Sequence, residues 1–346
     1  MRLLATALLL VSSPSAFAGV FSPNEPCPFE ISPDGTATPL PLNVFKLFLN
    51  DRVAALQATG PDIQSGSADT PTFRGGVLQR LRSAPASPSR AEMVGLSADL
   101  LRAGRSGEVV ELLKPVLRDR TLDYRLLAHL SLAHAALGDW DLALLRHANA
   151  VGDSEAPIEL GGTKPEQLKW MLKVDRTHTR PWLKAAQRDA SPATKTADPD
   201  VPPLFKMDAL PADAVAIAQQ LVLWSPRDNN LLWLLGAVHL AKGQIEAAFD
   251  ILEQCRERKM TWPKFRADHA NAEALYRALP KPPADEALVS TSEFVEADPP
   301  KRGLFAVVDP TQFALALGGF SVVVLGLFAL QLRKWRRLTA SGSRPG

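Results

Sequence analysis

The residues of this sequence whose types could do chemistry gather in one short stretch, "KVDRTHTRPW" at 173–182. Asp175, Arg176, His178 and Arg180 lie within six residues of one another, which is the mixture of acid, base and guanidinium groups that a polar functional cluster needs. An enzyme that uses this cluster is one hypothesis. The alternative is a solvated turn between two helices, which has the same composition.

Other signatures of catalysis or metal binding are missing from the sequence. His129 and His134 are five residues apart and do not share a helix face well, and no pair of histidines or cysteines has the spacing of a metal site. The sequence also lacks a Gly-x-Ser-x-Gly elbow, a phosphate-binding Gly-Lys-Ser/Thr loop and a dinucleotide-binding glycine fingerprint. We therefore predict no enzyme, no cofactor and no metal.

The two cysteines, Cys27 and Cys255, allow two interpretations. An exported domain could join them in a disulfide, and the sequence alone does not decide this. Cys255 lies on an apolar helical face, where buried free thiols are common.

The elements that would position any site are helices in pairs. From Ala91 onward, apolar periodic stretches are interrupted at Gly104, Gly138 and Gly243. The first two glycines are 34 residues apart, and a self-similarity of 34 residues is typical of a helix–turn–helix repeat. Glycine ends a helix at low cost because it adopts the left-handed conformation readily.

Small residues at fixed offsets predict close packing within each pair, because they let two helices approach while larger residues interdigitate. The positions that we expect to pack are Leu127, Leu130, Ser131, Gly138, Ala143 and Ala150 in one unit, and Leu232, Leu235, Gly236, Gly243, Ala248 and Cys255 in another.

This pattern resembles the tetratricopeptide repeat (TPR) family over about half of the chain. The strongest match is Leu232–Cys255, followed by Leu127–Ala150 and Met93–Val116. The resemblance implies an all-α fold, a TPR-like α-solenoid of helical hairpins over residues 91–279.

Several stretches are expected to complete this repeat domain. Residues 180–190 and 213–228 would form one more pair, separated by a proline-rich inserted loop near 190–208. Residues 165–174 would form an extra helix, and residues 266–279 a terminal capping helix that shields the last apolar face.

In the TPR family the first helices line a concave groove that receives peptides from partner proteins. The corresponding residues here are Ala128, Leu132, Ala135, Trp233, Ala237 and Leu240. The Lys and Asn residues with which some members clamp a terminal carboxylate are absent from these positions. The groove therefore suits an apolar helix or strand, or it is filled by the chain's own extra segments. Trp233 could anchor a partner or pack against a neighbouring helix.

The N-terminal end has the layout of a secretory signal peptide over residues 1–18, cut after Ala18. The alternative is an uncleaved anchor, but the apolar run Leu3–Val11 is too short to span a bilayer. Residues 19–90 are rich in Pro, Ser and Gly and predict an irregular segment with a short helix within 42–57.

The C-terminal end predicts a membrane anchor. Residues 311–332 carry no charge and, as a helix, would rise about 33 Å, which matches the hydrocarbon core of a bilayer. The basic stretch that begins the tail at 333–346 is typical of the cytoplasmic side. Residues 280–310 would be a flexible stalk between the repeats and the membrane.

Charge distribution narrows the class of partner. The chain has a net charge of +2, but Arg2 and the five bases of the tail supply six positive charges, so residues 19–332 carry −4. An acidic body argues against nucleic acid, which needs a basic face. The expected partners are other proteins or peptides, with the lipid bilayer contacted through 311–332.

Three functional hypotheses follow. The first is a single-pass scaffold whose body lies outside the cytoplasm, in the periplasm of a bacterium, and binds partner proteins. The second is an envelope assembly or chaperone-like factor that binds unfolded or unassembled exported chains. The third is an enzyme, and it rests only on the 173–182 cluster.

Overall fold

The structure is a computed structural model that describes residues 20–57, 73–115, 117, 123–154, 156–190 and 204–280. The predicted signal peptide, most of the inserted loop, the stalk after residue 280, the predicted span at 311–332 and the tail lie outside these residues. Within the described ranges, no helix combines the length and apolarity needed to cross a bilayer. The account below concerns the unit that ends at Leu279.

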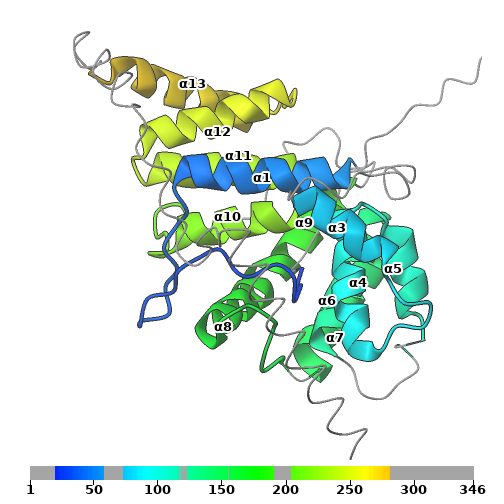
Figure 1. Ribbon diagram of the computed structural model, residues 1–346. Helices are drawn as coiled ribbons and strands as arrows, with labels where there is room; N and C mark the ends of the chain where they lie inside the picture. Colours follow the sequence, from blue (N-terminus) through cyan, green and yellow to red (C-terminus); the bar gives the residue numbers. More distant parts are fainter. Residues whose placement is uncertain are drawn as a thin grey trace, which may run out of the picture. The chain divides into compact units, whose positions relative to one another are not determined.

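The described part of the chain is all-α, as the sequence predicts (Figure 1). The described residues contain no strand, and isolated bridges pair Ile31 with Ala37 and Leu160 with Thr163. The helices are α1 (Leu42–Leu56), α3 (Phe73–Arg82), α4 (Arg90–Arg102), α5 (Ser106–Leu113), α6 (Tyr124–Ala136), α7 (Trp140–Asp153), α8 (Pro165–Val174), α9 (Arg180–Ala190), α10 (Ala214–Trp224), α11 (Asn229–Ala241), α12 (Ile245–Glu257) and α13 (Pro263–Ala278).

The three glycines predicted to interrupt the helices end them with the same backbone geometry. Gly104, Gly138 and Gly243 have φ values of +70°, +83° and +70°, in the left-handed region. After each glycine, the next N–H donates to the carbonyl five residues earlier, for example from Asp139 to His134 O at 2.9 Å. This is the Schellman arrangement, which satisfies carbonyls at the end of a helix and turns the chain back on itself. Helices α4 and α5, α6 and α7, and α11 and α12 are therefore hairpins.

Close approach within the hairpins depends on small residues, at the positions expected. A Cβ on Gly236 would lie 2.8 Å from both Cγ and Cδ2 of Leu252, so only glycine fits there without movement. Between α6 and α7, the Ser131 hydroxyl donates to Ala143 O at 2.7 Å. The apolar packing residues named above are buried, whereas the turn glycines Gly138 and Gly243 are exposed.

Residues 165–190 form one continuous helical run rather than two helices with a solvated turn. Helix α8 passes into α9 through a π-helical turn, η2 (Asp175–Thr179). The alternative that 173–182 is a solvated turn is therefore wrong. Wide turns of this kind insert one residue into a helix, change which side chains face inward and often lie at functional sites.

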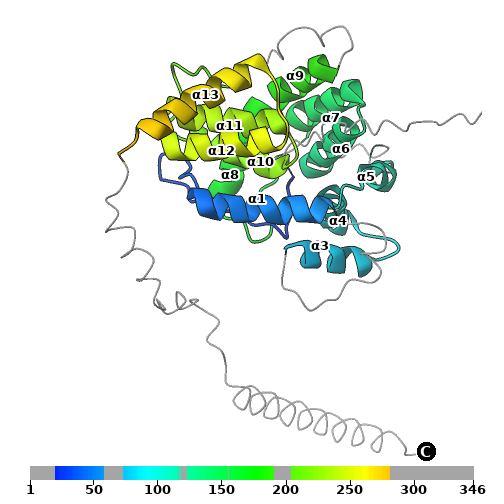
Figure 2. The same cartoon turned by 90° about the horizontal axis from the view of Figure 1, so that it is seen from above.

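The N-terminal residues 20–41 are irregular but deeply packed. Phe21 and Phe29 are fully buried, and Figure 1 shows the dark blue segment passing α8 and α10 before it enters α1. Helix α1 contacts α3, α4 and α10 (Figure 2), and its Lys46 forms an ion pair with Asp250 of α12. Together, the segment 20–41 and helix α1 connect the α4–α7 part of the molecule to the α10–α13 part.

Candidate functional site

The residues expected to line a concave groove lie mostly inside the protein. Ala128 and Leu132 are 0% exposed, and Ala135 and Trp233 are 1% exposed. Ala237 and Leu240 are partly buried and pack against the same core. These side chains therefore offer little surface to another protein in this conformation.

Trp233 packs against a neighbouring helix, which is the second of the two interpretations that the sequence allowed. Its indole Nε1–H donates to Asp268 Oδ2 of α13 at 3.0 Å, and its ring lies edge-on to Trp262 at a centroid distance of 6.3 Å. The Lys264 ammonium lies 5.0 Å from the centre of the ring. Burial raises the pKa of Asp268, although its hydrogen bond from Trp233 and the nearby Lys264 oppose this effect.

The N-terminal segment binds to these helices as an extended peptide would. The Gln219 side chain of α10 pairs with both backbone groups of Leu40, accepting from its N–H at 2.8 Å and donating to its carbonyl at 2.9 Å. Gln167 Nε2 of α8 donates to the carbonyls of Cys27 and Phe29 at 3.2 and 2.7 Å. Side-chain amides of α8 and α10 thus satisfy backbone groups of an irregular chain that has no secondary-structure partners.

Phe21 is the deepest anchor of this segment. Its ring meets Tyr124 edge-on at 5.5 Å and lies 6.0 Å from Trp224, measured between ring centres. Its backbone N–H donates to His129 Nε2 of α6 at 3.0 Å. The other ring nitrogen of His129, Nδ1, lies 2.7 Å from the Ser97 hydroxyl, which itself donates to Met93 O. His129 therefore fixes the segment through a buried hydrogen-bond chain.

The 173–182 cluster is divided between the interior and the surface. Asp175 is fully buried and accepts hydrogen bonds from Tyr124 Oη at 2.6 Å and from Thr179 Oγ1 at 2.7 Å. His147 Nε2 lies 3.5 Å from its Oδ2, and His147 is 1% exposed. The pKa of Asp175 is lowered, because contacts from His147, Tyr124 and Thr179 outweigh the opposing effect of burial. A carboxylate enclosed in this way has no access to a substrate.

The other titratable members of the 173–182 cluster are less enclosed than Asp175. Arg176 and Arg180 are exposed, and the Arg176 guanidinium lies 5.6 Å from the centre of the Tyr124 ring. The His178 ring stacks near Phe205 at 5.2 Å. Sequence reasoning missed Tyr124 and His147 as partners of Asp175, since they lie 51 and 28 residues earlier in the chain and no local pattern links them.

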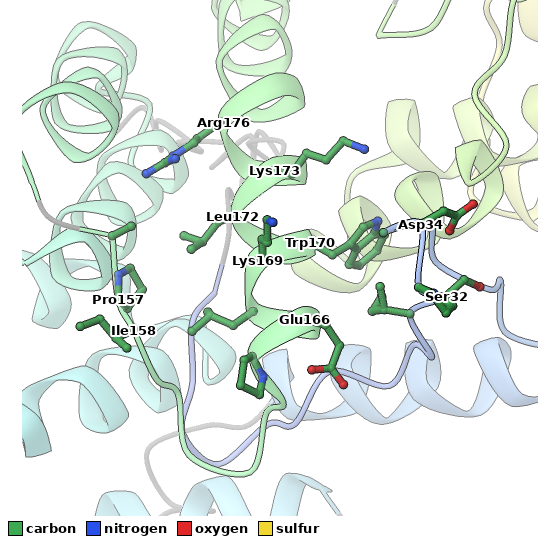
Figure 3. A pocket seen from close by; sticks show the side chains of 16 residues that line it. Ser32, Asp34, Pro157, Ile158, Glu166, Lys169, Trp170, Leu172, Lys173 and Arg176 are labelled. Carbon is green, nitrogen blue, oxygen red and sulfur yellow. The ribbon is translucent and has the colours of Figure 1, made fainter.

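Helix α8 crosses a hollow of about 970 Å³ (Figure 3). Ser32 and Asp34 lie on one side of α8, and Pro157 and Ile158 lie on the other. Ile158 is 93% exposed, although it is a large apolar residue. Such a hollow combines apolar surface with a few polar groups, as binding sites do.

Basic side chains of α8 and η2 line the same hollow. Lys169, Lys173 and Arg176 follow one another at helical spacing, and Figure 3 shows all three beside the space between the two loops. Glu166 and Asp34 are the acidic residues of its lining. The sequence showed these bases within an extra helix of uncertain partner, but it did not show the two loops that flank them.

Among the described residues, no group of three or more His, Cys, Asp or Glu side chains lies close enough together to hold a metal ion. Comparisons with protein-family models, with curated proteins and with solved structures find no match to this chain.

Proposed function

We propose that this chain is a membrane-anchored scaffold of TPR-like helical hairpins that binds a partner protein outside the cytoplasm. The 34-residue spacing of Gly104 and Gly138 and the shared hairpin geometry support the repeat assignment. The leader-like residues 1–18 and the uncharged stretch 311–332 support the topology, with the tail at 333–346 inside.

The binding site that we propose is the hollow crossed by α8, in place of the expected concave groove. The observation that carries this choice is the contrast in exposure between Ile158, at 93%, and Trp233, at 1%. A single exposed apolar residue is ordinary on a protein surface, but here it borders a hollow of about 970 Å³. A partner side chain that packed on Ile158 would remove apolar surface from water, which is the main favourable contribution to association.

The second candidate function is an assembly or chaperone-like factor for exported chains. The open hollow and its mixture of apolar and basic groups would also suit transient binding of many extended chains. We do not propose an enzyme, because the only candidate carboxylate of the 173–182 cluster, Asp175, is 0% exposed.

Photo-crosslinking in intact cells tests this proposal. A photo-reactive residue at position 158 would report on the hollow, and the same residue at exposed Arg266 of α13 would be the control. A scaffold predicts that one identified protein is captured reproducibly at position 158 and is not captured at 266. Capture of many unrelated exported chains at 158 would instead favour the chaperone-like function. Equal adducts at both positions, or none at 158, would overturn both.

The topology is tested separately. Protease is added to cells whose outer membrane is permeabilised and whose inner membrane is unbroken. It should digest the body and leave intact an epitope tag placed after residue 346. Loss of the tag would show that the C-terminal tail is not in the cytoplasm.

A further inference from the structure

The exposed side of the run from α8 to α9 carries a row of cations. Lys169, Lys173, Arg176, Arg180 and Lys184 follow one another at intervals of four, three, four and four residues, and all five are exposed. Within α8 and within α9, residues four apart lie on the same face, and the wider turn η2 between them shifts this spacing from Lys173 to Arg180. The row therefore extends along the helix for about 22 Å, from the hollow to the end of α9 that packs on α7.

The molecule neutralises this row only in part. Between residues 167 and 188 the only acidic residue is Asp175, which is buried and faces away from solvent. Lys169, Lys173, Arg180 and Lys184 form no ion pair with any other described residue. Glu166 and Asp34 line the same hollow, and Asp34 interacts electrostatically with Lys173, so these two carboxylates offset part of the charge. The five cations outnumber them and repel one another, so binding of an anionic partner would relieve an unfavourable interaction.

We infer that the partner segment held in this hollow is an extended, acid-rich stretch of polypeptide with at least one apolar side chain. This inference rests on the proposed function and specifies the chemistry of the partner. Its carboxylates would pair with the row that begins at Lys169, and its apolar side chain would pack on Pro157 and Ile158. In Figure 3, Arg176 points to the side of α8 on which Pro157 and Ile158 lie, whereas Lys173 points to the other side. A segment that lay across α8 could therefore make the hydrophobic contact and the ion pairs.

The shape of the site favours a peptide over a flat anionic membrane. The loop at residues 31–35 and the loop at 156–158 stand on either side of α8 in Figure 3. A bilayer surface would meet these loops before it reached Lys169, whereas a single extended chain can lie between them.

The charge of the whole body disfavours nucleic acid. Residues 19–279 carry a net charge of −1, to which the row contributes +5, so the rest of this unit carries −6 and would repel a long polyanion. A short acidic segment is affected mainly by the charges within a Debye length, which is about 8 Å at physiological ionic strength.

The test measures binding of a fluorescein-labelled peptide of twelve residues that contains six Glu and two Leu, by fluorescence anisotropy with the full-length protein in non-ionic detergent. The key variant, Lys169→Gln/Lys173→Gln/Arg180→Gln, neutralises three cations of the row and leaves Arg176 on the Tyr124 ring. The matched control, Arg256→Gln/Arg266→Gln/Arg277→Gln, removes the same charge from exposed positions on α12 and α13.

We expect the row variant to weaken binding by about threefold to 150-fold, since three exposed ion pairs would be lost, while the control changes it less than about twofold. Added salt should weaken binding to the unmodified protein and have a smaller effect on the row variant. Equal affinity of the two variants, or equal binding of a peptide in which Gln replaces every Glu, would overturn the inference. Binding that depends on the row but is tighter for phosphatidylglycerol vesicles or for oligo-dT than for the peptide would overturn the choice of partner.

The outcomes separate this inference from the proposed function. A partner captured at position 158 together with no binding of the acidic peptide would refute the acid-rich segment and leave the scaffold standing. Binding of the peptide without any partner captured at 158 would refute the scaffold and leave the anion-binding row.

Discussion

Arg102 holds Glu25 through two hydrogen bonds inside the core, from Nε to Oε1 at 2.7 Å and from Nη2 to Oε2 at 2.8 Å. Arg52 of α1 adds a third, from Nη2 to Oε2 at 3.1 Å, and Arg102 Nη1 donates to Leu223 O of α10 at 2.9 Å. One carboxylate of the N-terminal segment thereby connects α1, α4 and α10. All three charged side chains are buried, with 8% exposure or less.

Replacing Glu25 with Gln should lower the free energy of unfolding by about 3–5 kcal/mol, because two guanidinium groups would remain buried without a countercharge. The measurement is urea unfolding followed by tryptophan fluorescence. The control is Glu108→Gln, which removes an exposed carboxylate that pairs with Arg105 and should change the stability by less than about 1 kcal/mol. Equal stability of the two variants would show that the buried pair does not hold the segment.

His129 should make the protein lose stability in mild acid. Burial lowers its pKa from 6.5 to about 3, and its Nε2 must stay unprotonated to accept from the Phe21 N–H. Below pH 6.5 the unfolded chain binds a proton that the folded protein does not, so stability falls with pH from about 6.5 down to about 3. The loss between pH 7 and pH 5 should be on the order of 2 kcal/mol.

The variant His129→Gln tests this, because a glutamine can accept and donate in place of the ring but does not titrate. Its unfolding free energy should depend less on pH between 6.5 and 5. A residual slope should remain, since burial also lowers the pKa of His134, His178 and His239. An unchanged slope would contradict the role of His129.

Glu25 should affect the stability of the folded protein in a separate, more acidic range of pH. Burial alone would raise its pKa, but Arg102 and Arg52 lower it below 4.5 by a larger effect. The stability from this pair is therefore present above pH 4.5 and is lost as the pH falls further toward the lowered pKa. Between pH 4.5 and pH 3 the Glu25→Gln variant should lose less stability than the unmodified protein. The measurement is the unfolding free energy of each protein as a function of pH. Parallel curves for the two proteins between pH 4.5 and pH 3 would contradict this role of Glu25.

Gly236→Ala should destabilise the α11–α12 hairpin by about 1–3 kcal/mol, because its new methyl group would lie 2.8 Å from Leu252 and force the two helices apart. Gly152→Ala is the matched change at an exposed position of α7, where a Cβ would contact nothing within 4 Å. It should leave stability unchanged or raise it by up to about 1 kcal/mol, since alanine favours helix. Thermal unfolding of both variants gives the comparison, and a stabilised Gly236→Ala would refute the close approach.

The two cysteines should be free and unreactive in the folded protein. They are not bonded to each other, and burial raises the pKa of Cys27 to about 11 and that of Cys255 to about 12. A maleimide reagent at pH 7 should therefore modify neither in native buffer and both in urea, as mass spectrometry would show. Rapid modification of either thiol without urea would show that its surroundings open readily.

The sequence by itself determined most helices and the three hairpins that turn at glycine. It did not determine the expected pair of 180–190 with 213–228, because α9 packs on α7 while α10 packs on α11 and α1. Apolar periodicity and the glycines at 104, 138 and 243 act between neighbours in the chain, so the helix ends and the small-residue contact at Gly236 could be predicted from local pattern. The sequence also offered a concave groove as a binding site and, as an alternative, a groove filled by the chain itself.

Only the tertiary structure showed that most of the expected groove residues are buried and that the N-terminal segment packs against α6, α8 and α10. Phe21 meets His129 from 108 residues away, and Leu40 meets Gln219 from 179 residues away. The same is true of Asp175, whose enclosure depends on Tyr124 and His147, and of the hollow, which two distant loops form around α8. Hydrogen bonds and burial between residues so far apart in the chain depend on where the helices pack, and no periodicity within a single segment records that placement.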